Sequence, residues 1–186
     1  MAKQIFGTDG IRGVPGEYPL DDTTLDRVGV ALGEYVVLQS HVDGASPRVL
    51  IGRDTRESGP HIADRIIRGL SAAGAEPVSA GVLTTPGVAW LVSRESFAAG
   101  VVISASHNPY HDNGVKLISP SGMKFPDRVE AELEKSILSN KPPPTLARVR
   151  NGIDQPSDPE LHEDYLAALR QARFAPGSKA WRNAAK

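Results

Sequence analysis

Apolar residues along the chain follow two alternating patterns, one with the period of a helix and one typical of buried strands. Steps of three and four residues predict helices over residues 21–39, from about Ser58 to Gly74, after Pro86 and from Pro126. Short apolar runs predict strands at residues 48–52, 77–80, 99–103 and 114–118. Because helices and strands alternate, we expect a layered α/β domain with a largely parallel sheet.

Residues at the predicted helix ends carry start and stop signals. Asp21 or Asp22 is expected to cap the first helix, and Gly74 to end the second. Asp127 and Glu130 are expected to form a capping pair at the start of the helix after Pro126. These signals make the helix boundaries testable predictions.

The C-terminal part of the chain has a different character. Residues 141–144, Lys-Pro-Pro-Pro, predict a stiff extended connection. A last helix is predicted to begin at a second capping box, residues 157–160. Residues 176–186 show no periodicity, so no fixed structure is expected for them.

Composition narrows the classes of partner. The 186 residues include 21 basic and 22 acidic side chains, which give a formal charge of −1. This balance favours neither a nucleic-acid partner nor a membrane surface. The N-terminus has no apolar signal core, no run is long enough to span a membrane, and cysteine does not occur. We therefore expect a cytoplasmic protein.

The densest polar chemistry lies in residues 103–114, Ile-Ser-Ala-Ser-His-Asn-Pro-Tyr-His-Asp-Asn-Gly, between two predicted strands. Ligands gather at the carboxyl ends of strands in parallel sheets. The Asn-Pro and Asn-Gly turns are expected to expose the hydroxyl of Ser106 there. Ser106 lacks the Gly-x-Ser-x-Gly context of hydrolases, and adjacent His107 is expected to point away from it. The alternative role for Ser106 is a hydrogen bond within a turn.

Two neighbours of this serine have competing interpretations. His107 and His111 have the spacing of a metal pair, but Pro109 argues against the helix that would align them. Lys116 is either an ordinary lysine of an edge strand or a group returned to the mouth of the serine loop. At that mouth it would hold a phosphate or move a proton.

Two further loops carry arginine at strand ends. Residues 7–13 are glycine-rich and contain Arg12, whose planar fork suits phosphate oxygens. Residues 52–56 add Arg53 and Arg56, although a salt bridge at the strand end is at least as good an interpretation for Arg56. Three loops that bring arginine, glycine and serine to one sheet edge favour a phosphorylated substrate.

Together these motifs closely resemble the α-D-phosphohexomutases, and within them the branch of bacterial phosphoglucosamine mutases. The matching segments are Phe6–Gly13, Gly52–Gly59, Ile103–Pro109 and Asp112–Lys116. The resemblance implies a three-layer α/β/α sandwich with a mostly parallel mixed sheet in residues 1–145. Residues 146–186 would then hold a linker, a helix and the truncated start of a second domain.

The resemblance also implies an activity. Ser106 would be the phosphorylated serine, Arg12 would steady it, and Lys116 and His107 would handle protons or phosphate oxygens. Mg²⁺ would bind through the phosphorylated Ser106, and a hexose 1,6-bisphosphate would act as activator. The phosphosugar reaction would interconvert glucosamine 6-phosphate and glucosamine 1-phosphate through a bisphosphate intermediate, a step toward peptidoglycan precursors.

The sequence also departs from the family. Members have four domains, and this chain lacks the family's Asp-x-Asp-x-Asp-Arg loop for Mg²⁺, the sugar-selecting loop and the C-terminal phosphate loop. We expect a truncated or frame-shifted gene product, or a deliberate fragment, that is inactive or nearly so alone. It would pair with the missing C-terminal domains or form a homo-oligomer. Apolar residues of the last helix are expected to lack part of their cover: Leu161, Tyr165, Leu166 and Leu169.

Three alternatives stay open at this point. A phosphomannomutase or phosphoglucomutase would differ only in its sugar, and the loop that decides is absent. A non-catalytic interaction module, or the product of a pseudogene, would keep the fold without the reaction. A serine hydrolase is a more distant alternative.

Overall fold

The structure is a computed structural model that describes residues 5–40, 45–139 and 159–174. Its elements in chain order are β1 (Ile11–Gly13), α1 (Asp22–Gln39), β2 (Arg48–Arg53), α2 (Gly59–Ala72), β3 (Glu76–Val82), α3 (Thr85–Arg94), β4 (Ala99–Ile103), β5 (Asn113–Ile118), α4 (Asp127–Ile137) and α5 (Pro159–Phe174). Every helix and strand predicted from the hydrophobic pattern is present. The predictions for residues 141–144, for the capping box and for residues 176–186 concern segments wholly or partly outside the described residues.

The strands form one mixed sheet in the order β1-β5-β4-β2-β3. Strand β2 pairs in parallel with β3 and β4, whereas β5 is antiparallel to both β4 and β1. Four strands therefore run in one direction and β5 alone runs in the other. The expected mostly parallel mixed sheet is confirmed.

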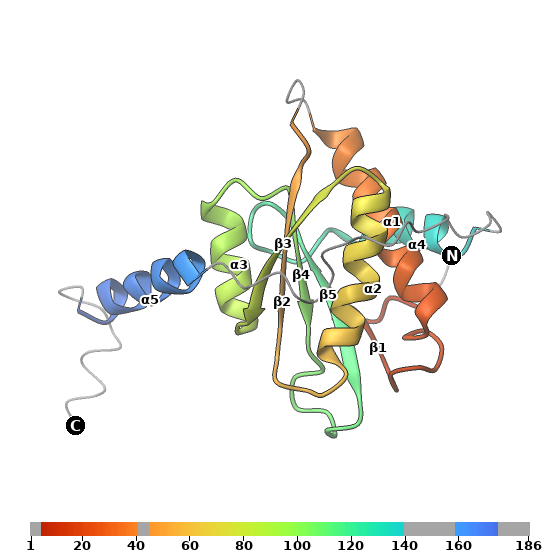
Figure 1. Ribbon diagram of the computed structural model, residues 1–186, viewed down its shortest axis with the longest axis horizontal. Coiled ribbons are helices and arrows are strands. Elements are labelled where there is room, and N and C mark those ends of the chain that lie inside the picture. The colour runs from red at the N-terminus through yellow and green to blue at the C-terminus, as the bar shows by residue number, and fades with distance from the viewer. Residues whose placement is uncertain (1–4, 41–44, 140–158, 175–186) are drawn as a thin grey trace.

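Helices cover both faces of the sheet (Figure 1). On one face, α1, α2 and α4 bury a larger core that includes Leu32, Ile66 and Leu133. On the other face, α3 buries a smaller core around Leu50 and Leu91. Helix–sheet–helix layering of this kind satisfies the apolar faces of both element types, and the three-layer prediction is confirmed.

The structure tests the predicted helix ends. Asp21 is the N-cap of α1, since its side chain accepts a hydrogen bond from the Thr24 N–H. Gly74 follows the end of α2 with a left-handed φ of 87°. Both predictions are confirmed.

The predicted capping pair at Asp127 and Glu130 is wrong. Pro126 occupies the N-cap position of α4 and makes no side-chain cap bond. Asp127 therefore lies inside the first helical turn. Its carboxylate contacts Lys124 Nζ at 3.3 Å, and Glu130 contacts the same nitrogen at 3.0 Å. Instead of the reciprocal bonds to backbone N–H groups of a capping box, the two carboxylates share an ion pair with Lys124, which precedes the helix.

One strand, β1, is not predicted by the hydrophobic pattern. Residues 11–13, interpreted as part of a glycine-rich loop, form β1 and pair with β5 along Ile11–Val115 and Arg12–Gly114. Three residues are too few to show an alternating pattern. Because β1 covers β5, Lys116 does not lie on an edge strand, and that interpretation of it is wrong.

Helix α5 packs on the α3 face of the sheet. Leu161 is only 6% exposed, His162 Nε2 lies 2.6 Å from the Ala80 carbonyl oxygen, and the Tyr165 ring lies beside Trp90. Leu166 and Leu169 are 41% and 47% exposed. The expected lack of cover is confirmed for these two residues and wrong for Leu161, because the first turn of α5 joins the smaller core.

None of the helices in the described ranges is long and apolar enough to cross a membrane.

Candidate active site

The predicted serine loop lies at the carboxyl end of the parallel strands. It joins β4 to β5, and residues 54–58 follow the neighbouring strand β2. Because β2 and β4 run in parallel, both loops emerge at the same sheet edge. Between them lies a cleft of about 800 Å³. Its lining consists of residues 54–58, of Val14 and Pro15, and of four residues of the serine loop, Ser106, Asn108, Tyr110 and His111.

Ser106 presents its hydroxyl to solvent on an unusual backbone. Its φ is 57°, in the left-handed region that a residue with a Cβ seldom adopts. Its N–H donates to Ser104 Oγ at 3.0 Å. His107 Nδ1 lies 3.5 Å from Ser106 Oγ, so the expectation that these adjacent side chains diverge is wrong. The left-handed turn at Ser106 brings them to the same side.

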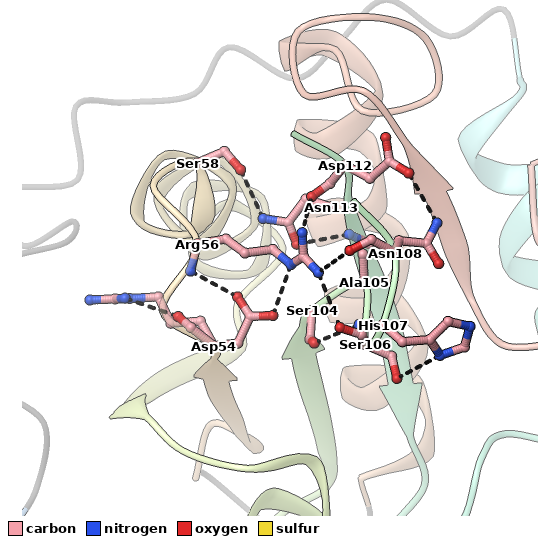
Figure 2. A network of polar contacts seen from close by, with 12 residues as sticks. Asp54, Arg56, Ser58, Ser104, Ala105, Ser106, His107, Asn108, Asp112 and Asn113 are labelled. Atoms are coloured by element: carbon pink, nitrogen blue, oxygen red, sulfur yellow. Dashed lines mark hydrogen bonds and ion pairs between the residues drawn. The ribbon is translucent and has the colours of Figure 1, made fainter. Parts of the chain in front are cut away.

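The guanidinium of Arg56 points in among the residues of this loop (Figure 2). Its Nε pairs with Asp54 Oδ2 at 3.1 Å, and its own backbone N–H donates to Asp54 Oδ1 at 3.0 Å. Its terminal nitrogens donate to four carbonyl oxygens of the serine loop, those of Ser106, Asn108, Pro109 and Asp112. The salt-bridge interpretation of Arg56 is confirmed, and the structure adds the contacts to the loop.

Arg12 approaches the same loop from β1. Its Nη1 donates to Asn108 Oδ1 at 2.8 Å and to the Ala105 carbonyl oxygen at 3.4 Å. Its Nη2 donates to Asp9 Oδ2 at 3.0 Å. The guanidinium thus contacts residues on both sides of Ser106 and remains partly exposed, which leaves it accessible to an anion at the serine.

Lys116 joins this group through Asp9. Its Nζ lies 2.6 Å from Asp9 Oδ2, the same oxygen that Arg12 contacts, and its side chain is 14% exposed. The hydrogen bond from Lys116 lowers the pKa of Asp9, against an opposing effect of partial burial, and Arg12 lowers it further. One carboxylate therefore links the two cations that the sequence predicted for the site.

The segment that carries Asp9 is itself anchored. Glu134 of α4 accepts hydrogen bonds from the backbone N–H groups of Ile5 and Phe6, at 2.9 and 3.0 Å. The Gly7 N–H then donates to the Gly10 carbonyl oxygen at 2.8 Å and closes a tight turn. This turn places Asp9 between Arg12 and Lys116.

Comparison with known proteins agrees with this geometry. Residues 3–143 match the family model described as phosphoglucomutase/phosphomannomutase, alpha/beta/alpha domain I. The chain belongs to this family. The matched residues include both polar loops at the carboxyl edge of the β2–β4 pair.

Individual relatives refine the comparison. The chain is 55% identical over 138 residues to a phosphoglucosamine mutase of Solibacter usitatus, a match over 74% of this chain and 30% of that protein. It is 46% identical over 172 residues to a phosphoglucosamine mutase of Koribacter versatilis, covering 90% and 36%. It also resembles the crystal structure of a phosphoglucomutase/phosphomannomutase family protein of Burkholderia thailandensis, with a TM-score of 0.60, 28% identity, and coverage of 74% and 30%. The chain spans about a third of the length of these curated relatives.

Membership of the family implies Mg²⁺, and the described part of this phosphohexomutase domain offers it few ligands. No group of three or more His, Cys, Asp or Glu residues suited to a metal occurs there. The nearby carboxylates of Asp9, Asp54 and Asp112 contact Lys116, Arg56 and Asn108 respectively. These residues alone do not form a Mg²⁺ site, because a hard cation needs several oxygen ligands.

Three asparagine and serine contacts complete the loop of the domain. Asn113 is fully buried, donates to Ser58 Oγ at 2.9 Å and accepts from the Gly114 N–H at 2.8 Å. Asn108 donates to Asp112 Oδ2 at 3.0 Å across the turn. The turn predicted at Asn108-Pro109 is confirmed, since the Asp112 N–H donates to the Pro109 carbonyl oxygen. The turn predicted at Asn113-Gly114 is wrong, because these two residues begin β5 and pair with β1. The bond from Asn113 to Ser58 joins distant segments and has no local signal in the sequence.

Proposed function

We propose that this domain carries the phosphorylated serine of a phosphoglucosamine mutase. Ser106 would give its phosphoryl group to glucosamine 6-phosphate and recover one from the bisphosphate intermediate, which leaves glucosamine 1-phosphate. The observation that carries this proposal is the exposed hydroxyl of Ser106 on a left-handed turn, at the mouth of a cleft and flanked by Arg12. The identity of 55% to a phosphoglucosamine mutase favours this branch over the phosphomannomutases.

The chemistry follows from the groups around the hydroxyl. In the forward step the bond between phosphorus and Ser106 Oγ breaks, and a bond from phosphorus to a sugar oxygen forms. The sugar hydroxyl loses its proton to a base, and His107 or Lys116 would hold that proton. Arg12 would steady the charge that builds on the phosphoryl oxygens, which is the main need in phosphoryl transfer.

A metal would add to the same charge neutralisation. Mg²⁺ bound to phosphorylated Ser106 would withdraw charge from the transferring group. Because the described residues supply too few oxygen ligands, further ligands must come from elsewhere in the complete enzyme. We therefore assign to this domain the phosphoserine ligand alone.

The remaining organisation follows from the resemblance. Residues 1–145 would be the phosphoserine domain, and residues 146–186 a linker, a helix and the start of a second domain. The phosphosugar would bind between this domain and C-terminal domains or a second copy of the chain. A hexose 1,6-bisphosphate would load the serine, and the cytoplasm is the compartment we expect for the reaction.

The test is phosphate on one hydroxyl. The chain is incubated with glucose 1,6-bisphosphate, Mg²⁺ and a fragment that holds the remaining domains of a phosphoglucosamine mutase, and phosphopeptides are mapped by mass spectrometry. We expect phosphate on Ser106 in the natural chain and in the control Ser71→Ala, and none at that site in Ser106→Ala. An unmodified Ser106 in a folded complex would reject the proposal and favour a non-catalytic interaction module.

A further inference from the structure

Arg56 is the residue whose role the structure changes most. From the sequence, the arginines of residues 52–56 were candidates for a phosphate. We infer that Arg56 instead positions Ser106, by holding the serine loop in its folded shape. This inference rests on the proposed function of Ser106, because only a reacting serine needs to be positioned. The contacts between Arg56 and the loop are independent of that function.

The hydrogen bonds of Arg56 account for its whole donor capacity. A guanidinium has five N–H donors in a fixed plane. Asp54 Oδ2 takes the donor on Nε, two carbonyl oxygens take those on Nη1, and two more take those on Nη2. The side chain is 12% exposed. No donor is left for a substrate phosphate.

The acceptors lie along the loop that must be shaped. The carbonyl oxygens come from Ser106, Asn108, Pro109 and Asp112, at 3.1, 2.9, 2.6 and 3.0 Å. Ser106 and Asp112 would lie about 20 Å apart in an extended chain, so a single planar group can contact all four carbonyl groups only when the loop curls around it. Arg56 therefore acts as a template for the turn that Ser106 begins.

The template is fixed to the sheet. Asp54 holds Arg56 at two points, through Nε and through the backbone N–H. The Asp54 N–H in turn donates to the carbonyl oxygen of Ile103, the last residue of β4, at 3.0 Å. Through Arg56 and Asp54, the loop that follows β4 is therefore connected to the end of the same strand.

This arrangement explains how Ser106 keeps its backbone conformation. A left-handed residue with a Cβ persists only where its surroundings enforce it. Here the carbonyl of Ser106 is bound by Arg56 and its N–H by Ser104. With both peptide groups held, the hydroxyl makes no contact with Arg56; it lies 3.5 Å from His107 Nδ1 and lines the cleft.

A lysine cannot replace this function. An ammonium keeps the charge but offers three donors around one point, so it cannot reach four carbonyl groups and Asp54 at once. Arg56→Lys therefore separates the two roles. If Arg56 binds phosphate, the lysine variant should keep part of the affinity for phosphate through its charge. If Arg56 shapes the loop, the variant should lose the folded shape of the loop.

The first experiment measures amide hydrogen exchange in the chain itself. The amides of Ser106, Asn108 and Asp112 are hydrogen-bonded within the loop, and their exchange reports its opening. We expect Arg56→Lys and Arg56→Ala to speed their exchange by about tenfold or more, because bonds to a charged group are lost. The amides of α2 should be unaffected. Arg53→Lys is the control, since the side chain of Arg53 donates to the Asp54 carbonyl oxygen and, within the described residues, to no carbonyl of the serine loop.

A chemical rescue sharpens this test. Methylguanidinium added at millimolar concentration should refill the space in Arg56→Ala and slow the exchange of the loop amides again. Sodium chloride at equal ionic strength should not. If the Arg56→Ala chain fails to fold, Arg56→Lys and Arg56→Gln provide the same comparison. If the loop amides of folded Arg56 variants exchange as slowly as those of the unsubstituted chain, the inference is overturned.

A second readout separates positioning from binding. In the complemented phosphorylation assay, we expect Arg56→Lys to lower the maximal rate of Ser106 phosphorylation at an unchanged half-saturating concentration of glucose 1,6-bisphosphate. A raised half-saturating concentration with an unchanged maximal rate would overturn the inference and make Arg56 a phosphate ligand. Failure of the natural chain to take phosphate would reject the proposed function while the exchange result still stood.

Discussion

Asp9 occupies the place that an anion would take between the two cations of the site. Its Oδ2 contacts Lys116 Nζ at 2.6 Å and Arg12 Nη2 at 3.0 Å. One negative charge is thereby shared between two positive charges, and the group of three side chains keeps a net positive charge. A phosphoryl group arriving at Ser106 must compete with this carboxylate for them, so Asp9 sets how strongly the site attracts anions.

The first prediction at this scale is that Asp9→Asn strengthens anion binding. Removing the charge frees Arg12 and Lys116, and inorganic phosphate should bind severalfold more tightly in an NMR titration that follows the Gly10 amide. The free energy of unfolding should change by less than about 1 kcal/mol, because exposed ion pairs contribute little. Glu57→Gln, a neutralised carboxylate elsewhere on the cleft, is the control. Equal phosphate affinities in the three chains would contradict the prediction.

The lowered pKa of Asp9 adds a dependence on pH. A carboxyl with a depressed folded pKa stabilises the fold fully above its unfolded value of 3.8, and loses this contribution as pH falls through the folded value. The difference in unfolding free energy between the natural chain and Asp9→Asn should therefore be constant at neutral pH and shrink only below about pH 4. Chemical denaturation along a pH series measures it. A difference that disappears near pH 6 would show that another group is responsible.

Sequence alone identified which residue types meet at the site, but not how they pair. Ser106, His107, Arg12 and Lys116 were predicted because strand ends and turns are local patterns. The binding of Lys116 by Asp9 depends on the register of a strand that was not predicted, β1. Contacts between segments follow from that register, which local periodicity does not encode.

At the scale of elements, α1 and α2 pack with their backbones in close approach. A Cβ built on Gly69 would lie 2.7 Å from the Val30 nitrogen and 2.8 Å from the Gly29 Cα. Backbone atoms cannot move aside as a flexible side chain would. The pair of glycines therefore sets the distance between the two helices that cover the sheet beside the site.

We predict that Gly69→Ala destabilises the protein although alanine is the better helix former. The gain of about 1 kcal/mol in helix propensity is opposed by steric strain and helix displacement of roughly 1–3 kcal/mol, with less scope for relaxation against backbone. Net destabilisation should appear in urea unfolding. Ser71→Ala in the same helix is the matched control and should be neutral or slightly stabilising. A more stable Gly69→Ala chain would show that the helices can separate freely.

Element types were predictable from the sequence because helix and strand periods differ and the apolar runs are clear. The predictions were wrong for a very short strand and for the start of one helix. β1 has three residues, and the start of α4 depends on Lys124, which lies outside the helix. Both depend on partners that are remote or outside the repeating pattern.

For the molecule as a whole, the alternation of elements predicted layers but not the order of strands. The antiparallel β5 lies between β1 and β4. The short connection from β4 to β5, which contains no helix, is compatible with an antiparallel pair and not with a parallel crossover, but no local pattern places β5 beside β1. The result is two cores of unequal size on the two faces. Stability should therefore be uneven between the two faces of the sheet.

Helix α5 lies at the weak end of this distribution. Within the part of the helix whose side chains are described, only Leu161 is buried, whereas α2 buries Ile62, Ile66, Ile67 and Leu70 among others. A helix held by few apolar contacts opens without unfolding the rest of the protein.

We predict that amides of α5 exchange much faster than those of α2, and that Leu161→Ala speeds the exchange of the α5 amides further while leaving that of the α2 amides unchanged. Ile66→Ala should instead lower global stability by about 2–5 kcal/mol and speed exchange in both helices. Hydrogen exchange followed by mass spectrometry distinguishes the cases, and equal protection of α2 and α5 in the natural chain would show that the smaller core holds α5 as firmly as the larger core holds α2.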